Sequence, residues 1–297
     1  MKCDLCPRKC LVDRKKGEKG ICGQTENLKV ARAALHFWEE PCISGDEGSG
    51  AVFFSGCPLH CVFCQNENIA NGTVGKEISL ERLVDIFLEL QEKGANNINL
   101  VTPGHFVPQI VKALDQARRE GLALPIVYNT SSYETVDTIK MLEGYVDIYL
   151  PDFKYMSPVL SKKYSHAPDY AEVAKAAIAE MVRQTGKAVF VNGDEDNLIL
   201  SGTIVRHLTL PGCMADSMQI LKYLHDTYGD KIYISIMNQF TPLSNLEKYP
   251  ELNRRITDEE YETLVDYAID IGIENGFIQE GDTAEESFIP AFDCEGV

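Results

Sequence analysis

The chain has 297 residues, 44% of them hydrophobic, so it can bury a large core and fill one barrel-sized domain. With 45 acidic and 28 basic residues, its net charge of −17 disfavours a nucleic-acid partner, which needs a basic surface. No apolar signal region begins the chain and no apolar run approaches membrane-spanning length, so we expect no membrane association. Ten cysteines without a secretory signal favour a cytoplasmic location, with thiols that bind metal or act in catalysis.

Residues 1–47 are expected to form a small separate unit rich in cysteine. Its thiols have the spacing C-x2-C-x3-C-x11-C and belong to Cys3, Cys6, Cys10 and Cys22. Such a short segment buries too little apolar surface to fold by itself, so we expect a bound metal to hold it together. Four thiolates suit either structural zinc or an Fe–S cluster, and free thiols packed against the rest of the chain are a third interpretation.

Two further features lie in this unit. Basic residues gather at Arg8-Lys9, Arg14-Lys15-Lys16 and Lys19. A solvated loop is the favoured interpretation, and the alternative is a docking patch for an acidic electron donor of the flavodoxin or ferredoxin type.

The segment that leads into the first predicted strand holds the only tryptophan, Trp38. We expect its indole to anchor the N-terminal unit to the rest of the chain. His36, Glu39 and Glu40 are neighbouring candidates for lining a site, although a structural role is favoured for the histidine.

The strongest signal in the chain lies between Val52 and Asn68. An apolar run, Val52–Phe54, is followed by a Ser-Gly turn and by three cysteines with the spacing C-x3-C-x2-C, namely Cys57, Cys61 and Cys64. Three thiolates can hold an Fe–S cluster that keeps one iron without a protein ligand, whereas the ordinary cluster takes four. Zinc with His60 as a fourth ligand and disulfides are the alternatives.

This motif resembles that of the radical S-adenosylmethionine (SAM) superfamily. The resemblance implies a 4Fe–4S cluster whose open iron chelates the amino and carboxylate groups of SAM. It also implies that one electron from the cluster breaks a C–S bond to give a 5′-deoxyadenosyl radical. Phe63, just before the last cysteine, fits the same pattern.

Short apolar runs then alternate with helical patterns over residues 48–280. The expected strands span residues 51–54, 98–101, 125–128, 146–150, 203–210 and 231–237. The expected helices span residues 80–93, 107–120, 136–142, 169–185 and 215–227, with a last helix from Thr257, where Glu260 completes a capping box. Residues 187–200 are expected to be an irregular excursion. Six strand–helix repeats imply parallel strands with right-handed crossovers, an α/β fold.

In such a fold, reactive residues gather at the carboxyl ends of the strands. Polar clusters follow or end the predicted strands at residues 102–105, 129–132, 151–155, 206–207 and 238–239. They share this edge with the cysteine loop, so the sequence predicts one common mouth.

The candidate SAM-binding residues at this mouth are Thr102, Asn129, Thr130, Ser131, Asp152, Lys154 and Arg206. The threonine offers an oxygen to the SAM amino group, and the segment 129–131 suits ribose oxygens or the SAM carboxylate. Arg206 is expected to pair with a carboxylate. His207 faces the opposite way in an extended strand and is not expected in the same cavity.

Nearly the whole chain resembles the radical SAM proteins related to pyruvate formate-lyase activating enzyme. The resemblance rests on the strand ends Tyr128–Ser131, Leu150–Lys154 and Arg206–Gly212. A branch of uncharacterised activating-type proteins also shares the motifs at residues 6–10, 38–41, 99–106 and 149–155. The family implies an oxygen-sensitive partial (β/α)6 barrel that cleaves SAM. For the activating enzymes proper, it implies removal of a backbone glycine hydrogen from a partner enzyme.

The chain departs from that family at three points. The Gly-Gly-Glu motif after the second strand is missing, Asn129 replaces an acidic residue, and the four-cysteine unit is added. We therefore expect SAM cleavage on a protein or peptide substrate, with glycyl-radical activation as one case. A small-molecule or RNA substrate and a non-catalytic metal-binding module are the alternatives. The expected units are the cysteine-rich extension 1–47, the barrel 48–280 and an acidic tail 281–297, in which residues 288–292 are the part expected to dock.

Overall fold

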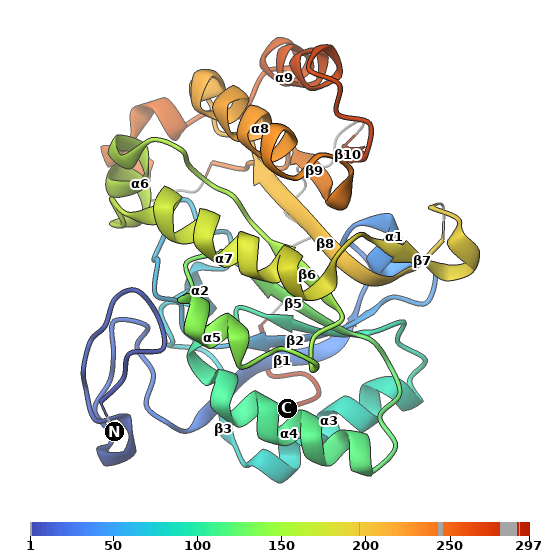
Figure 1. The fold of residues 1–297 in the computed structure, drawn as a ribbon. Helices are drawn as coiled ribbons and strands as arrows, with labels where there is room; N and C mark the ends of the chain where they lie inside the picture. Colours follow the sequence, from blue (N-terminus) through green and yellow to red (C-terminus); the bar gives the residue numbers. More distant parts are fainter. Residues whose placement is uncertain (1, 196, 243–245, 280–289, 291) are drawn as a thin grey trace.

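The computed structural model describes residues 2–195, 197–242, 246–279, 290 and 292–297. Their strands lie in the order β10-β9-β8-β6-β5-β4-β2-β1-β3, with β7 paired to β8 (Figure 1). The central strands are parallel neighbours: β2 Ser49–Phe54, β4 Ile98–Val101, β5 Ile126–Thr130, β6 Ile148–Pro151, β8 Ile199–Leu208 and β9 Tyr233–Met237. This partly open parallel sheet confirms the predicted α/β partial barrel.

All six predicted strands are present, and helices follow them as expected. The six main helices are α3 Leu80–Glu92, α4 Val107–Arg119, α5 Val136–Lys140, α7 Tyr170–Thr185, α8 Met214–Tyr228 and α9 Asp258–Asp270. Local chemistry sets where they begin. Ser79 accepts a hydrogen bond from the Arg82 backbone N–H at 3.1 Å, and Thr257 and Glu260 form the predicted capping box.

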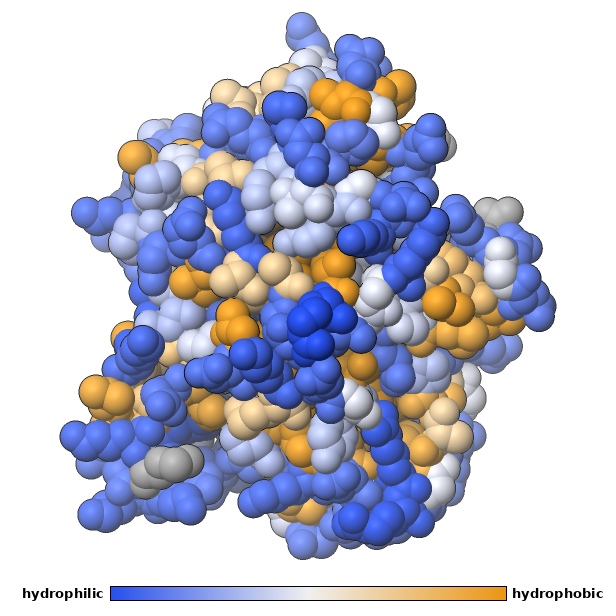
Figure 2. All heavy atoms as spheres, in the orientation of Figure 1, coloured by the Kyte–Doolittle hydropathy of each residue, from blue (hydrophilic) through white to orange (hydrophobic). Residues whose placement is uncertain are grey.

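The helices cover one face of the sheet, and the core lies between the two layers (Figure 1). Large side chains that are fully buried there include Phe54, Phe87, Phe106, Tyr128 and Tyr149. The opposite face of the parallel strands is left to line a cavity. Figure 2 shows hydrophilic side chains over most of the visible surface, with hydrophobic residues in small separate groups.

The expected boundary at residue 47 does not match the sheet. Strand β1, Leu28–His36, pairs antiparallel with β2, and β3, Lys76–Ile78, pairs with β1. Residues 28–36 therefore belong to the barrel sheet. Their strand signal is weak, because β1 contains three alanines together with Lys29 and Arg32, and alanine and lysine have low strand propensity. Strand β10, Gly276–Ile278, extends the other edge beside β9.

The short elements fill the connections. Helices α1 Pro41–Ser44, α2 Glu67–Ala70 and α6 Pro158–Ser165 were not predicted. The excursion at residues 187–200 is partly regular, because β7, Val189–Phe190, pairs antiparallel with the start of β8. Short 3-10 turns occur at Arg14–Lys16, Gly104–Phe106, Val191–Gly193, Gly229–Lys231, Leu246–Lys248 and Pro250–Leu252.

The end of the predicted acidic tail docks on β1. The Cys294 N–H donates to the Ala31 carbonyl oxygen at 3.1 Å, and Arg32 forms ion pairs with Asp293 and Glu295. Phe292 packs edge-on against Phe53, with ring centroids 5.4 Å apart, whereas residues 280–289 and 291 lie outside the described residues. No helix among the described residues is long and apolar enough to cross a membrane.

Candidate active site

The cysteine loop leaves the carboxyl end of β2 and lines a cavity inside the partial barrel. The cavity has a volume of about 520 Å³, and Cys57, Cys61 and Cys64 all line it. Gly56 makes the sharp exit from the strand with φ +94°, and a Cβ there would lie 2.5 Å from the Cys22 carbonyl oxygen. Position 56 therefore requires glycine, which lets the loop pack closely against the N-terminal unit.

The three cysteines are half-buried in the cavity wall, and their surroundings disfavour the thiolate form. Burial, together with the Cys61 thiol, raises the pKa of Cys57 to about 11. Burial also raises the pKa of Cys64 and of Cys61, although Lys154 opposes the rise at both. Such thiols stay protonated at neutral pH until a metal supplies positive charge that favours the thiolate.

The zinc alternative needs His60 as a fourth ligand, and the structure disfavours it. His60 Nε2 lies 2.8 Å from the Ile21 carbonyl oxygen, so this nitrogen is the donor of a hydrogen bond. Within the described ranges, no three His, Cys, Asp or Glu side chains are arranged to hold a single metal ion.

A contact that the sequence did not reveal touches one of these thiols. Ser165 Oγ donates a hydrogen bond to Cys61 Sγ at 3.0 Å, and the Tyr155 hydroxyl lies 2.8 Å from the same Oγ. Ser165 ends α6, about a hundred residues further along the chain than its partner. Hydrogen bonds to ligand sulfurs tune the potential of a bound cluster.

Ser165→Ala should lower the reduction potential of a cluster bound at the cysteine loop, by an amount on the order of tens of millivolts. The hydrogen bond stabilises the more negative, reduced cluster, and the alanine removes it. An EPR-monitored redox titration of the reconstituted protein measures the shift. Ser161→Ala, on the same helix, is the control, because Ser161 Oγ donates to the Pro158 carbonyl oxygen instead.

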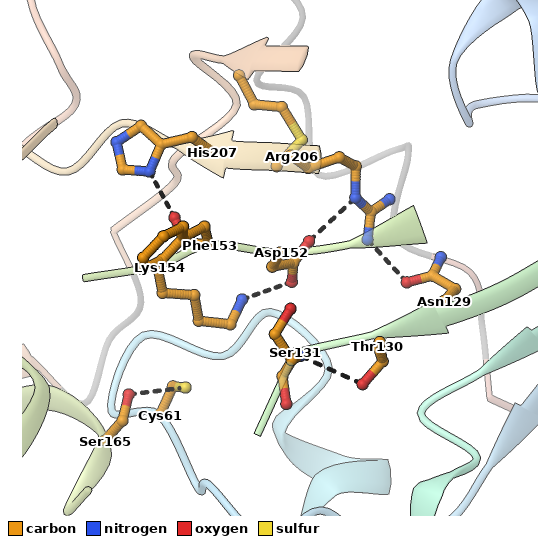
Figure 3. Close-up of polar contacts among 12 residues, drawn as sticks. Cys61, Asn129, Thr130, Ser131, Asp152, Phe153, Lys154, Ser165, Arg206 and His207 are labelled. Atoms are coloured by element: carbon orange, nitrogen blue, oxygen red, sulfur yellow. Dashed lines mark hydrogen bonds and ion pairs between the residues drawn. The ribbon is translucent and has the colours of Figure 1, made fainter. Parts of the chain in front are cut away.

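A network of charged side chains forms the middle of the cavity wall (Figure 3). Arg206 donates through Nε to Asp152 Oδ1 at 3.0 Å and through its two terminal nitrogens to Glu39 Oε2 at 2.9 Å and Asn129 Oδ1 at 2.7 Å. Lys154 Nζ donates to Asp152 Oδ2 at 2.6 Å. Asn129 also donates to Glu39 Oε1 at 3.1 Å, which an aspartate could not do. The asparagine that departs from the family pattern thus links an arginine to a carboxylate.

The network determines the charges that the cavity presents. Burial alone would raise the pKa of Asp152, but Lys154 and Arg206 outweigh it and the pKa is lowered. Burial would lower the pKa of Lys154, but Asp152 outweighs it and the pKa is raised. Arg206 was predicted to pair with a carboxylate, and the structure gives it two within the chain. Lys154, which has three donor hydrogens and uses one on Asp152, is better placed to receive a ligand carboxylate.

The other candidate residues end β4 and β5 and line the same cavity. Thr102 has a left-handed backbone with φ 55°, and its N–H donates to the Asn129 carbonyl oxygen at 2.9 Å. The Ser131 carbonyl oxygen accepts from the Tyr170 hydroxyl at 2.9 Å. All ten predicted residues of the barrel mouth therefore line one cavity, and their contacts with SAM stay predictions. His207 points away, as predicted, with its ring nitrogens 2.8 Å from Phe153 O and Ser217 Oγ.

Glu134 is a buried acid that supports this region and that the sequence analysis missed. Its Oε1 accepts from Thr130 Oγ1 at 2.8 Å and from the Tyr128 hydroxyl at 3.2 Å. Burial raises the pKa of Glu134 to about 7, although both hydrogen bonds act against the rise. Glu134 therefore fixes the position of the Thr130 hydroxyl whether or not a ligand is bound.

Because the folded chain holds the Glu134 proton more tightly than the unfolded chain, the free energy of unfolding should fall as pH rises from about 4.5 to about 7. The shift corresponds to a loss of at most about 3 kcal/mol, which Glu134→Gln should remove. Urea unfolding of the wild type and the variant at pH 5.5 and 8 measures it. The exposed Glu262→Gln should leave the wild-type pH dependence unchanged, and a wild-type stability that is flat over this range would contradict the prediction.

A family model for the radical SAM superfamily matches residues 51–197, which include the cysteine loop and four of the parallel strands. The chain belongs to the radical SAM superfamily. Over 273 residues it is 27% identical to the uncharacterised protein MJ0674 of Methanocaldococcus jannaschii, a match that covers 90% of this chain and 74% of the relative.

Two solved structures are similar to this radical SAM chain. SAM-bound SuiB of Streptococcus suis is 14% identical, with a TM-score of 0.52, over 77% of this chain and 49% of SuiB. HydG, a maturase of the FeFe-hydrogenase, is 14% identical, with a TM-score of 0.52, over 78% of this chain and 51% of HydG. This chain spans about half the length of each protein, and at this identity the likeness shows the shared fold.

Radical SAM membership supports a 4Fe–4S cluster, SAM binding and reductive cleavage of SAM. Cys57, Cys61 and Cys64 are the residues that would hold the cluster, since their three half-buried thiols share one loop and one cavity wall. The family's Gly-Gly-Glu position falls at Thr102–Gly104 in this chain. A Cβ on Gly104 would lie 2.3 Å from Glu134 Oε1, so the close approach of this carboxyl requires glycine there.

The radical SAM cavity continues away from the cysteines to residues that precede β2. His36, Trp38, Glu39 and Glu40 line it there. Burial, reinforced by Arg32 and Arg206, lowers the pKa of His36 to about 4, so its ring is neutral at pH 7. Trp38 was predicted to be a packing anchor, which is wrong, because its side chain is 60% exposed beside the cavity.

The four N-terminal cysteines lie beside the radical SAM loop. A Cβ on Gly20 would lie 3.5 Å from Cys10 Sγ and 3.6 Å from Cys22 Sγ, so these sulfurs are no more than about 7 Å apart. Burial raises the pKa of Cys6 to about 12, and the thiols of Cys22 and Cys10 contribute. The set thus converges, without the tight geometry of a single-ion site in the described part of the chain.

Arginines of the predicted basic cluster fasten this unit to the barrel. Arg8 Nε donates to the Pro58 carbonyl oxygen at 2.9 Å, and its guanidinium lies over the Tyr133 ring, 5.1 Å from the centroid. Arg14 is buried and donates to the Thr25 carbonyl oxygen at 2.9 Å. The solvated part of the cluster is therefore lysine: Lys9, Lys15, Lys16 and Lys19 are exposed.

Proposed function

We propose that this chain cleaves SAM at the cysteine loop and uses the radical to take a hydrogen atom from a protein or peptide. The observation that carries the proposal is the single cavity that joins three half-buried thiols to a charged and aromatic wall. These thiols would hold a 4Fe–4S cluster, which when bound and reduced would supply the electron for cleavage of SAM to methionine and the 5′-deoxyadenosyl radical. The side chains that line the cavity hold SAM and the substrate.

The candidate residues divide this work by their chemistry. The Lys154 ammonium, fixed by Asp152, is suited to the SAM carboxylate. Thr102 oxygens are suited to its amino group, and the amide and hydroxyl groups of Asn129 and Ser131 to ribose oxygens. Arg206 positions Asp152 and, with it, the lysine.

Size and charge support a protein or peptide substrate. A cavity of about 520 Å³ lies within the roughly 300–1,000 Å³ typical of a site for one small ligand. Once SAM fills much of it, the substrate has to enter with a slender part, such as a side chain or a backbone loop. The net charge of −17 argues against RNA. Activation of a glycyl radical enzyme, as the activating-enzyme resemblance suggests, is one such reaction.

The electron donor we propose is an acidic protein of the flavodoxin or ferredoxin type. The exposed lysines at positions 9, 15, 16 and 19 sit on the unit that contacts the cysteine loop. Opposite charge there would steer an acidic donor to the side of the barrel that holds the thiols.

We further propose that Cys3, Cys6, Cys10 and Cys22 bind zinc or a second Fe–S cluster. Cys3→Ala should lower metal content and thermal stability before it affects SAM cleavage, because the unit supports the loop without lining the cavity. Iron and zinc analysis with a thermal melt measures this. Unchanged metal content in the variant would contradict metal binding at this unit.

The substrate class can be tested by following deuterium into 5′-deoxyadenosine. The reduced, reconstituted enzyme and SAM are incubated with an extract of deuterated cells that contain this chain, divided by ultrafiltration into large and small fractions. Deuterium from the large fraction that is lost after protease treatment is the expected result. Deuterium from the small fraction, or its loss after ribonuclease treatment, would overturn the proposal in favour of a small molecule or RNA.

A further inference from the structure

The end of the cavity away from the cysteines is closed by α1, Pro41–Ser44. Asn96 Nδ2 donates to the Ser44 carbonyl oxygen at 2.6 Å, and Asn97 Nδ2 donates to the Ile43 carbonyl oxygen at 2.8 Å. Both asparagines precede β4, so α1 is attached at the amino ends of the parallel strands. In Figure 1, α1 accordingly lies near the opposite end of the parallel strands from α2 and the N-terminal loops.

Glu40 enters the cavity at this closed end, immediately before α1. Its backbone carbonyl accepts from the N–H groups of Ile43 and Ser44 at 2.8 and 3.0 Å, which fixes the residue. The side chain lines the cavity and is only 8% exposed. Its Oε2 is buried and has no hydrogen-bond partner among the described residues. A buried carboxyl oxygen without a partner is costly, and it lies in the wall of a space made for a ligand.

Glu40 differs from the other charged groups of the described cavity wall, because it forms no ion pair there. Among the described lining residues, the cations are Lys154 and Arg206, and the carboxyl groups are Glu39, Glu40 and Asp152. The donors of Arg206 are directed at Asp152, Glu39 and Asn129, and Lys154 is bound to Asp152. These four charges pair with one another, whereas burial raises the pKa of Glu40 despite the opposing effects of Arg206 and of a hydrogen bond with Ser235.

The structure assigns Glu40 as the anchor for a cationic nitrogen group of the substrate, an ammonium or a guanidinium. This inference rests on the proposed function, because it describes what the substrate presents to the same cavity. For a protein or peptide, the group is a lysine or arginine side chain, whose slender stem can pass SAM and reach the closed end. A charged hydrogen bond would give Oε2 the partner that it lacks among the described residues, and the cation would favour the carboxylate form of Glu40.

The surroundings of Glu40 suit such a cation. His36 is neutral at pH 7 and does not repel it, and the lining of the same cavity includes the aromatic rings of Phe53 and Phe277 and the indole of Trp38. Apolar and aromatic surfaces cover the stem of a long basic side chain, and rings attract its charged end.

The test compares a cation with an uncharged molecule of the same shape. Binding of n-butylguanidinium and of n-butylurea to the reconstituted, SAM-bound enzyme is measured by calorimetry at pH 7. At least ten-fold tighter binding of the guanidinium is expected in the wild type, and Glu40→Gln should abolish that preference. Glu47→Gln, which changes an exposed acid just beyond α1, is the matched control and should keep it.

Several results would overturn the inference. Equal binding of the two probes to the wild type requires no variant and would rule out a cation site. A preference that persists in Glu40→Gln would place the site elsewhere. A loss of SAM affinity in that variant as large as the loss for the probe would assign Glu40 to SAM itself. Failure of the proposed function is a separate result, since it appears as absence of 5′-deoxyadenosine from the wild type.

Discussion

Cys61→Ala is expected to abolish SAM cleavage. Its thiol is one of only three on the loop, lies between the other two in sequence, and accepts the hydrogen bond from Ser165. Two thiolates cannot hold a cubane that needs three protein ligands and one open iron. Iron in the reconstituted variant should fall by about four per chain, and 5′-deoxyadenosine should disappear. Cys57→Ala and Cys64→Ala should behave in the same way.

The control for this prediction is a cysteine outside the cavity. Cys213→Ala changes a half-buried thiol at the start of α8 that does not line the cavity, so iron content and SAM cleavage should stay near wild type. Retained activity in Cys61→Ala would contradict the assignment of the cluster to this loop.

Arg206→Met is expected to lower the free energy of unfolding by about 3–5 kcal/mol, the usual cost of breaking a buried ion pair by removing one partner. The side chains of Arg206, Asp152 and Glu39 are 13%, 16% and 8% exposed, so methionine leaves two carboxylates poorly solvated. Lys154 alone remains to balance them. Because Asp152 also fixes Lys154, we expect SAM binding to weaken as well.

Arg183→Met provides the comparison for this variant. Arg183 also pairs with two carboxylates, Glu143 and Glu180, but its side chain is 52% exposed. The loss should therefore be no more than about 1 kcal/mol. Urea unfolding of both variants and the wild type measures the difference, and equal losses would contradict a buried network at Arg206.

The location of the site could be predicted, because reactive residues of parallel α/β folds generally gather at the carboxyl ends of the strands. The apolar runs of β4, β5 and β6 each stop at polar residues, and parallel strands bring these stops together. That reasoning predicts that Thr102, Asn129 and Asp152 line one cavity. It also separated Arg206 from His207, since neighbours in a strand face opposite ways.

Glu39 and Glu40 were candidates for lining a site, but their contacts and those of the remaining site residues could not be predicted. Glu39 and Glu40 precede a four-residue helix, and their place in the barrel depends on β1 pairing with β2. Ser165 meets the site through a tertiary contact with Cys61, 104 residues earlier in the chain. Glu134 contacts Thr130 only four residues away, but no motif distinguishes it from the other polar residues of that turn. The carboxylate partners of Arg206 were also hidden, because Glu39 lies 167 residues earlier in the chain. Sequence patterns predict strands and their ends, whereas these contacts depend on how separate elements pack.

The N-terminal unit illustrates the same limit. The cysteine spacing indicated a compact loop-rich segment, but nothing in it indicated where the segment docks. The contact of Arg8 with Pro58 and that of Ile21 with His60 place it beside the cysteine loop. Any metal that the unit holds therefore lies beside the cysteine loop.

The most direct test of this account is to reconstitute the protein anaerobically with iron and sulfide, reduce it with dithionite, add SAM and measure 5′-deoxyadenosine against iron content. The account predicts the nucleoside at about four irons per chain, or at about eight if the N-terminal cysteines also bind a cluster. Absence of the nucleoside at full iron loading would contradict SAM cleavage and leave the chain as a metal-binding protein.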